Sequence, residues 1–198
     1  MGFKLWGFRE KLASADVNAY LMNQANIVCT SGARPSTPVD GMEIFETDTR
    51  RKLRYSTSDG WLMWPPTATE VTDPTNFTTT STVFSAGATN CEITFSGPPT
   101  GRVMIACAGQ LSNSGAGQTS RLSWELRAGS VSGSIVQAAD INNAVTQQGV
   151  EVVQASSPWK LVTGLTAGAT YYIRTMHSVG SGTATITMRR LSILPLPN

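Results

Sequence analysis

Apolar and polar positions alternate in three short runs between Arg34 and Trp64, and this pattern predicts a small β-meander. The turns fall at residues 48–51, which begin with an aspartate able to bond its own backbone, and at residues 56–60, which end in Asp-Gly. Three short strands are too few to fold alone in water. Their apolar side chains must therefore pack on a partner or on the chain's own N-terminal helix. These side chains are Met42, Ile44, Leu53, Tyr55, Trp61 and Trp64.

The residues before the meander, 1–33, predict a docking arm that contains one short helix. Ser14 can cap this helix, and one of its faces is apolar at the helical spacing. A helix lying on a membrane surface is the alternative, but the segment is short and not basic, so docking onto protein is favoured. The side chains expected to dock are Phe3, Trp6 and Phe8 before the helix and Val17, Tyr20 and Leu21 on it.

Residues 83–198 show strand and turn signals at the intervals typical of an all-β sandwich or barrel. The clearest alternating runs are 91–95, 103–107, 121–127 and 170–179, and residues 183–196 end the chain as a long strand. Shorter candidates lie at 134–139, 150–155 and 159–162. About eight strands in one domain of this length close most economically as an antiparallel jelly-roll-like β-sandwich.

The stretch 65–82 lies between these parts, starts with two prolines, is rich in threonine and has no helical period. It predicts a linker, with a long first edge of the sandwich as the alternative. The predicted fold is therefore mainly β in four parts. They are a docking arm at 1–33, a meander module for attachment at 34–64, the linker at 65–82 and the sandwich at 83–198.

The charge content is low and narrows the classes of partner. Only 14% of the residues are charged, against about 25% in an ordinary soluble domain. The net charge of +2 and the scattered basic residues argue against nucleic-acid binding. No apolar run approaches the ~20 residues of a membrane span, and the start of the chain lacks the apolar segment of a signal peptide. We expect a soluble chain made in the cytoplasm, with no membrane insertion.

The sequence offers no residues for catalysis, for a cofactor or for a metal. The three cysteines, Cys29, Cys91 and Cys107, have no metal-ligand spacing, and we expect them to be reduced, although a disulfide between Cys91 and Cys107 stays open. The single histidine, His177, lies in an alternating strand and is interpreted as structural. A non-enzymatic protein is therefore predicted. A hydrolase built from scattered carboxylates is the weakest alternative.

Aromatic residues of the second part are the remaining hint of binding. Trp124, Trp159, Tyr171 and Tyr172 could stack on sugars, but aromatic side chains on strands more often fill a core or a subunit interface. The adjacent Tyr171 and Tyr172 point to opposite faces, so only one of them can lie in the core. Trp159, Tyr171 and Tyr172 are therefore the candidates for surface recognition.

The N-terminal third resembles the attachment regions of virion proteins from tailed phages, in particular small minor tail and fibre-like proteins of phages that infect actinobacteria. The matching pieces cover about residues 13–64 and read ADVNAYLMNQ, TSGARPSTPVDGM and EIFETDTRRKLRYSTSDGW. The second part is more loosely similar to the trimeric jelly-roll knobs of such proteins, whose outline is that of tumour necrosis factor and C1q. Its matching pieces are TFSGPPTGRVMIACAG, LVTGLTAGATYYIRTMHSV and ITMRRLSILPLP.

This resemblance implies a non-enzymatic structural protein of a phage particle, assembled in the host cytoplasm. The N-terminal region would anchor to other virion proteins, and the β-domain would project outward as a homotrimer that touches a host cell-surface glycan. A trimeric decoration protein that stabilises the capsid (head) shell is the nearest alternative. A carbohydrate-binding module, using Trp159, Tyr171 or the loop 112–120, is an alternative from another class.

Overall fold

The computed structural model describes residues 27–57, 60–63, 68–87 and 91–196. The chain divides into two compact units, with the boundary between Pro65 and Pro66. Among the described residues the regular elements are strands, apart from the short 3-10 helices η3 (Ser31–Ala33) and η4 (Ile141–Asn143). The mainly β fold class is therefore confirmed. The N-terminal helix of the predicted docking arm lies outside the described residues.

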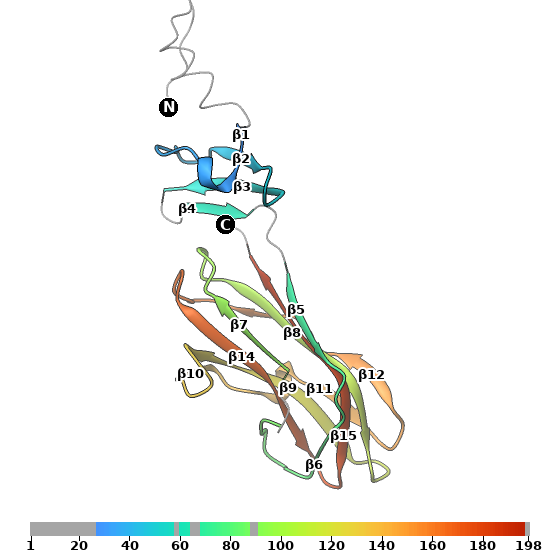
Figure 1. Cartoon of the computed structure of the whole chain (residues 1–198). Helices are drawn as coiled ribbons and strands as arrows, with labels where there is room; N and C mark the ends of the chain where they lie inside the picture. Colours follow the sequence, from blue (N-terminus) through green and yellow to red (C-terminus); the bar gives the residue numbers. More distant parts are fainter. Residues whose placement is uncertain (1–26, 58–59, 64–67, 88–90, 197–198) are drawn as a thin grey trace, which may run out of the picture. The chain divides into compact units, whose positions relative to one another are not determined.

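The first unit is a four-stranded sheet in the order β1-β2-β3-β4 (Figure 1). Strands β2, β3 and β4 pair antiparallel as a meander, as the alternation predicts. The sequence did not predict that β1 pairs parallel to β2 and adds a fourth strand at the edge. The strands are β1 (Ile27–Cys29), β2 (Glu43–Glu46), β3 (Arg51–Ser56) and β4 (Gly60–Met63).

The carboxylate of Glu46 is buried on the inner face of this sheet, at a position where an apolar side chain is usual. Ile44 and Glu46 both point inward from β2 and are fully buried. The Arg34 side chain forms a salt bridge with Glu46, and the Thr49 hydroxyl donates a hydrogen bond to it at 2.6 Å. The hydrogen bond from Arg34 is the main reason that the pKa of Glu46 is lowered. This pairing lets a charged side chain occupy a core position of a small sheet.

The second unit contains a five-stranded and a six-stranded sheet, in which every strand pair is antiparallel. The first has the order β10-β9-β14-β7, with β11 also on β9. The second has the order β12-β8-β15-β5, with β13 also on β8 and β6 also on β15. The strands are β5 (Thr69–Asp73), β6 (Phe77–Thr79), β7 (Glu92–Ser96), β8 (Val103–Asn113), β9 (Thr119–Ala128), β10 (Ile135–Gln137), β11 (Val145–Gln148), β12 (Val153–Ser156), β13 (Lys160–Val162), β14 (Thr170–Val179) and β15 (Ala184–Pro195).

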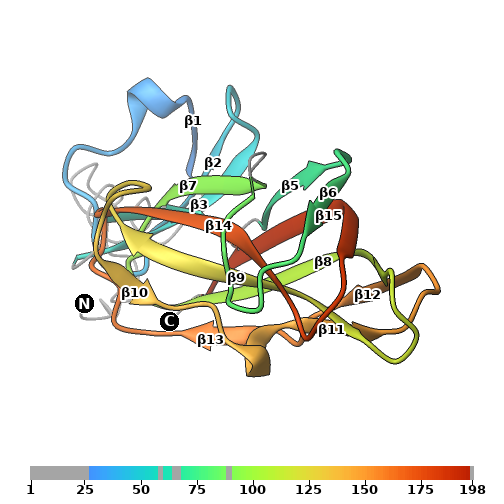
Figure 2. The ribbon, with the colours of Figure 1, turned by 90° about the horizontal axis from the view of Figure 1, so that it is seen from below.

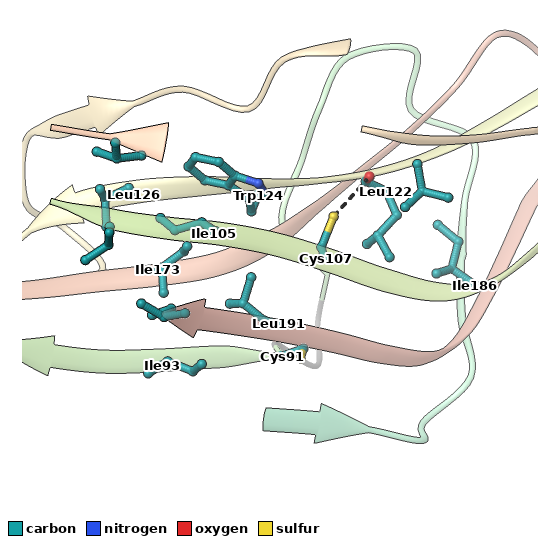
Figure 3. Close-up of a cluster of buried hydrophobic side chains, with 14 of the residues drawn as sticks. Cys91, Ile93, Ile105, Cys107, Leu122, Trp124, Leu126, Ile173, Ile186 and Leu191 are labelled. Atoms are coloured by element: carbon teal, nitrogen blue, oxygen red, sulfur yellow. Dashed lines mark hydrogen bonds between the residues drawn. The ribbon is translucent and has the colours of Figure 1, made fainter. Parts of the chain in front are cut away.

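The hydrophobic core of this unit lies between the two sheets (Figure 3). The five-stranded sheet contributes Leu122, Trp124 and Leu126, which alternate along β9 as the sequence predicts, and the six-stranded sheet contributes Ile105 and Leu191. Trp124 is the largest fully buried side chain of the described residues. Its ring therefore fills the core and does not face a ligand.

All three cysteines are free, so the alternative of a disulfide between Cys91 and Cys107 does not occur. The Cys107 thiol donates to the Leu122 carbonyl at 3.5 Å (Figure 3), and the Cys91 thiol donates to the Arg189 carbonyl at 3.6 Å. Burial raises the pKa of Cys91 to about 11 and that of Cys107 to about 12. Both thiols therefore stay protonated and act as small core residues.

Much of the predicted linker is part of the sandwich. Residues 69–73 and 77–79 form β5 and β6, and both strands pair with β15. A threonine-rich segment can be an unpaired linker. Threonine and valine are β-branched, however, and are also good strand formers at a sheet edge. Val71 packs against the core while its neighbours stay exposed. The alternative prediction, a long first edge of the sandwich, therefore fits residues 69–73 and 77–79.

A β-bulge in β15 changes which side chains enter the core. The register with β8 shifts between Thr187 and Arg190, and Met188 adopts a left-handed conformation with φ of 49°. The extra residue reverses the alternation, so Arg189 points inward and is fully buried while Met188 and Arg190 face solvent. A charged side chain thereby enters the interior of the second unit.

Candidate functional site: interaction surfaces

The predicted anchoring residues that the structure describes point into the first unit. Met42, Ile44 and Leu53 are buried, and Tyr55 and Trp61 are half-buried with their rings edge to face at 5.2 Å. Met42, Ile44 and Leu53 are thus buried within the chain itself and do not form a surface for a partner, whereas Tyr55 and Trp61 keep part of their surface exposed. The alternative, packing on the chain's own N-terminal helix, falls outside the described residues. Phe3, Trp6, Phe8, Val17, Tyr20, Leu21 and Trp64 lie outside the described residues.

The exposed apolar residues of the first unit lie on the opposite face of its sheet. Val28 and Phe45 are register partners on β1 and β2, and they are 65% and 43% exposed. Beside them, Lys52 forms a salt bridge with Glu43 at 2.6 Å. The sequence does not identify Val28 as an exposed residue, because Ile27–Cys29 is uniformly apolar and does not reveal which side chain faces out. Phe45 faces out because it alternates along β2 with the buried Ile44 and Glu46.

Exposed apolar side chains of the second unit concentrate on one lateral side of the sandwich. Strands β10, β11 and β12 and helix η4 lie along this side, and β5, β6 and β7 lie along the opposite one (Figure 2). Among the described residues, nine of the thirteen exposed large hydrophobic residues fall between positions 131 and 161. We define the lateral edge as the first seven of these, which are Val131, Ile135, Val136, Ile141, Val150, Val152 and Val153.

The lateral edge carries little charge. Between residues 131 and 153 the only charged side chains are Asp140 and Glu151. Asp140 caps η4, and its carboxylate accepts a hydrogen bond from the Asn142 backbone at 2.6 Å. Proteins usually protect exposed strand edges with charged residues, lysine above all, yet no lysine stands within this edge. Unprotected apolar strands are expected to be covered by another protein surface.

Of the three candidates for surface recognition, only Trp159 is exposed, at 49%. Tyr171 is buried in the core, stacks on Phe95 and accepts a hydrogen bond from the Thr166 backbone at 2.8 Å. Tyr172 is also buried and donates a hydrogen bond to Glu92. Burial raises the pKa of Tyr172 to about 12, so it remains a donor at neutral pH. We therefore correct the expectation for both tyrosines.

Charged side chains explain why Tyr172 is buried although it lies on the outer face of its sheet. Glu125 on the neighbouring strand accepts hydrogen bonds from Arg127 at 2.6 Å and from Arg174 at 3.0 Å. Burial raises the pKa of Glu125, but these two guanidinium groups outweigh that effect and the pKa is lowered. The ion pairs and Tyr172 close this face with the unit's own side chains.

A polar cluster around Arg189 lies inside the second unit. The Arg189 guanidinium donates to Asp73 at 2.6 Å and lies 3.3 Å from Nε2 of His177. Phe77 covers the cluster, with its ring centroid 5.5 Å from the guanidinium carbon and 4.5 Å from the histidine ring. Burial, aided by the charge of Arg189, lowers the pKa of His177 to about 4. His177 is neutral at pH 7 and has no exposed surface with which to meet a substrate.

Within the described ranges, no group of three or more histidine, cysteine, aspartate or glutamate residues is arranged to hold a metal ion. The same part of the chain contains no helix long and apolar enough to cross a membrane. Three surfaces of the described residues could engage a partner. They are the Val28 and Phe45 pair, the lateral edge, and the sheet face around Trp159.

No protein-family model matches the chain, and no curated protein matches it. Among solved structures, the chain is similar to one of infectious bursal disease virus, Gx strain, with a TM-score of 0.42, 10% identity and coverage of 68% of this chain and 35% of that one. The enzymatically active domain of bacteriophage CBA120 tailspike protein 4 has a TM-score of 0.28, 13% identity and coverage of 62% and 19%. A Bacillus endospore appendage protein has a TM-score of 0.23, 14% identity and coverage of 66% and 92%. The chain thus spans about a third of the length of the virus chain.

Proposed function

We propose that this chain is a non-enzymatic structural protein of a phage particle that assembles with copies of itself. Its N-terminal region anchors to other virion proteins, and its β-sandwich projects outward. The observation that carries the proposal is the lateral edge, a charge-poor apolar side of a sandwich whose opposite side is polar. The resemblance of residues 13–64 to tailed-phage attachment regions supports the particle as its location.

The proposed jelly-roll form of the second unit is supported by its strand order. Along the chain, β7, β8 and β9 alternate between the two sheets, as do β13, β14 and β15. Each sheet is an antiparallel stack of four positions, β5-β15-β8-β12 in one and β7-β14-β9-β10 in the other. Such an order interlocks two Greek keys. It also leaves one lateral side with the short, apolar strands described above.

Self-association through the lateral edge follows from the hydrophobic effect. The valines and isoleucines of the edge are partly exposed, so each one that a neighbour covers stabilises the contact by about 1 kcal/mol. The edge is nearly uncharged, so copies do not repel one another there. Oligomers usually close by rotation, and we propose three copies around one axis. Such a ring covers every lateral edge and leaves no open end for a filament.

The expected mass of the purified chain at micromolar concentration is that of three copies of 21.1 kDa. Replacing Ile135 and Val152 together by aspartate should yield single chains, because charged side chains would have to be buried in each contact. Sedimentation equilibrium or mass photometry measures the mass of the natural chain and that of the double variant. The matched control is Val83→Asp, an equally apolar exposed site outside the edge, which should stay trimeric. A monomeric natural chain, or an unchanged mass for the double variant, contradicts the proposal.

Purified phage particles should contain the chain, and imaging of particles labelled on its second unit should show where it lies. The resemblance favours the tail, and density spread over the head would instead assign it to capsid decoration. Both locations require the N-terminal region for incorporation, so a chain that lacks residues 1–26, and therefore keeps β1 in the sheet of the first unit, should be missing from particles while it still folds. Incorporation of that truncated chain at the normal level would refute the anchoring role.

A further inference from the structure

The outer face of the six-stranded sheet is open and carries small side chains. Ala106 and Ala108 point outward from β8, between inward residues such as Ile105 and Cys107. The register places Ala106 beside Ser192 on β15, and Ser192 beside Glu70 on β5. Figure 2 shows these strands in the order β5, β15, β8 and β12. These residues form a strip that crosses the sheet.

Trp159 stands at one end of this strip. Lys160 pairs with Ile105, and Leu161 pairs with Met104, so the preceding Trp159 falls next to Ala106. Alternation along β13 buries Val162 and turns Leu161, and with it Trp159, toward the outer face. Ala106 is only 8% exposed although it lies on an open face. Its large neighbours on this face include Trp159, which precedes β13, and Met104 on β8.

Hydrogen-bonding groups stand at the other end of the strip. The Ser192 hydroxyl donates to the Glu70 carboxylate at 2.9 Å, and this bond holds the carboxylate in place. Glu70 is exposed, so its remaining lone pairs can accept from a ligand. Arg190 lies one row away, between Ala108 and Thr72, and is also exposed. Its guanidinium offers donors only.

The combination of an exposed indole and fixed polar groups fits one class of ligand. A pyranose ring has an apolar face of C–H groups that can lie on an indole, and a rim of hydroxyl groups that both donate and accept. Trp159 and Glu70 are three strand spacings apart, about 14 Å, which suits several linked rings. The positive charge of Arg190 and the negative charge of Glu70 cancel, so the strip favours an uncharged sugar over a charged one. We propose that this strip binds a neutral oligosaccharide, with Trp159, Ser192, Glu70 and Arg190 as the contact residues.

This inference rests on the proposed outward orientation of the second unit, and it names what that unit contacts. A protein partner fits the strip less well. A stable protein interface buries about 800 Å² on each side around an apolar centre, whereas the large apolar side chains here gather at one end and the rest of the strip is small or polar. The strip adjoins the lateral edge at β13, because β12 and β13 pair with the same side of β8, whereas Ser192, Arg190 and Glu70 lie on β15 and β5, away from that edge.

The test applies the full-length chain to an array of neutral hexose and N-acetylhexosamine oligomers, with sialylated and sulfated glycans beside them. We expect binding to neutral oligomers, and calorimetry with the strongest array ligand then gives the affinity. Trp159→Ala should weaken binding at least about tenfold, and Glu70→Gln about threefold or more. Ile141→Ala, which changes an exposed residue of the lateral edge, should leave the affinity within about twofold.

Absence of binding by the natural chain to every array glycan would overturn the inference, as would binding that survives Trp159→Ala. If Trp159→Ala instead changes the oligomer mass, the strip is a protein interface and the sugar proposal is wrong. A trimer that is found in particles but binds no sugar leaves the proposed function standing. A monomeric chain that binds neutral sugars through Trp159 would contradict the proposed self-association and leave the sugar-binding inference standing.

Discussion

Replacing Arg189 by alanine is expected to lower the free energy of unfolding of the second unit by about 3–5 kcal/mol. The change removes the partner of Asp73 at 2.6 Å and of His177 at 3.3 Å, so the buried His177 ring and the partly buried Asp73 carboxylate lose this donor. The stacked Phe77 ring also loses the guanidinium beneath it. Urea denaturation, followed by the fluorescence of the buried Trp124, measures the loss.

Arg190→Ala is the matched control, because Arg190 is the next residue along β15 and faces solvent. It should change the free energy of unfolding by no more than about 0.5 kcal/mol. Equal effects of the two substitutions would mean that the ion pair to Asp73 contributes nothing to stability. The comparison uses the same strand and the same residue type, so it isolates the effect of burial.

Mild acid should also destabilise the second unit, and His177 sets the pH range. Its pKa falls from an ordinary value of 6.5 to about 4 in the folded chain, because burial and then the charge of Arg189 oppose protonation. Between these two values the unfolded state binds the proton and the folded state does not, so stability is lost as the pH falls. The loss amounts to about 2 kcal/mol at pH 5 and approaches about 3 kcal/mol below pH 4.

Because the chain has one histidine, its NMR signal reports this titration directly. The folded protein should show a midpoint near pH 4 instead of 6.5. Urea midpoints at pH 7.5 and pH 5 give the stability loss, and His177→Gln should remove most of the difference, whatever its own stability. The pKa of Asp73 is lowered, because the hydrogen bonds from Thr75 and Arg189 outweigh the effect of its burial. Protonation of Asp73 therefore reduces the free energy of unfolding only at a lower pH. A histidine midpoint near 6.5 would refute this account.

Alternation predicted the parts of the fold in which one face is apolar and the other polar. Leu122, Trp124 and Leu126 alternate with polar residues, so β9 and its inward face could be identified from the sequence. The meander of the first unit followed from the same pattern. Strand β5 could not be recognised in this way, because it is an edge strand in which only Val71 packs on the core.

Tertiary context decided the positions that the local pattern does not reveal. Glu46 occupies a core position because Arg34, twelve residues earlier, reaches it. Arg189 is buried because a bulge shifts the phase of β15, and nothing in the local pattern marks that bulge. Tyr172 is covered by charged side chains from neighbouring strands. The lateral edge was not predicted either, since its valines and isoleucines resemble core residues until the strand order shows them at a border.

The Arg189–Asp73 pair also has a mechanical meaning. Strand β5 is the first strand of the second unit, so any pull that reaches this unit through the chain from residues 1–65 acts first on Thr69. Five register pairs hold β5 to β15, from Thr69 opposite Ile193 to Asp73 opposite Arg189. Peeling would break the pair at Thr69 first and the one at Asp73 last. The ion pair between Arg189 and Asp73 thus lies at the last of these five pairs, where it resists the final step of such peeling.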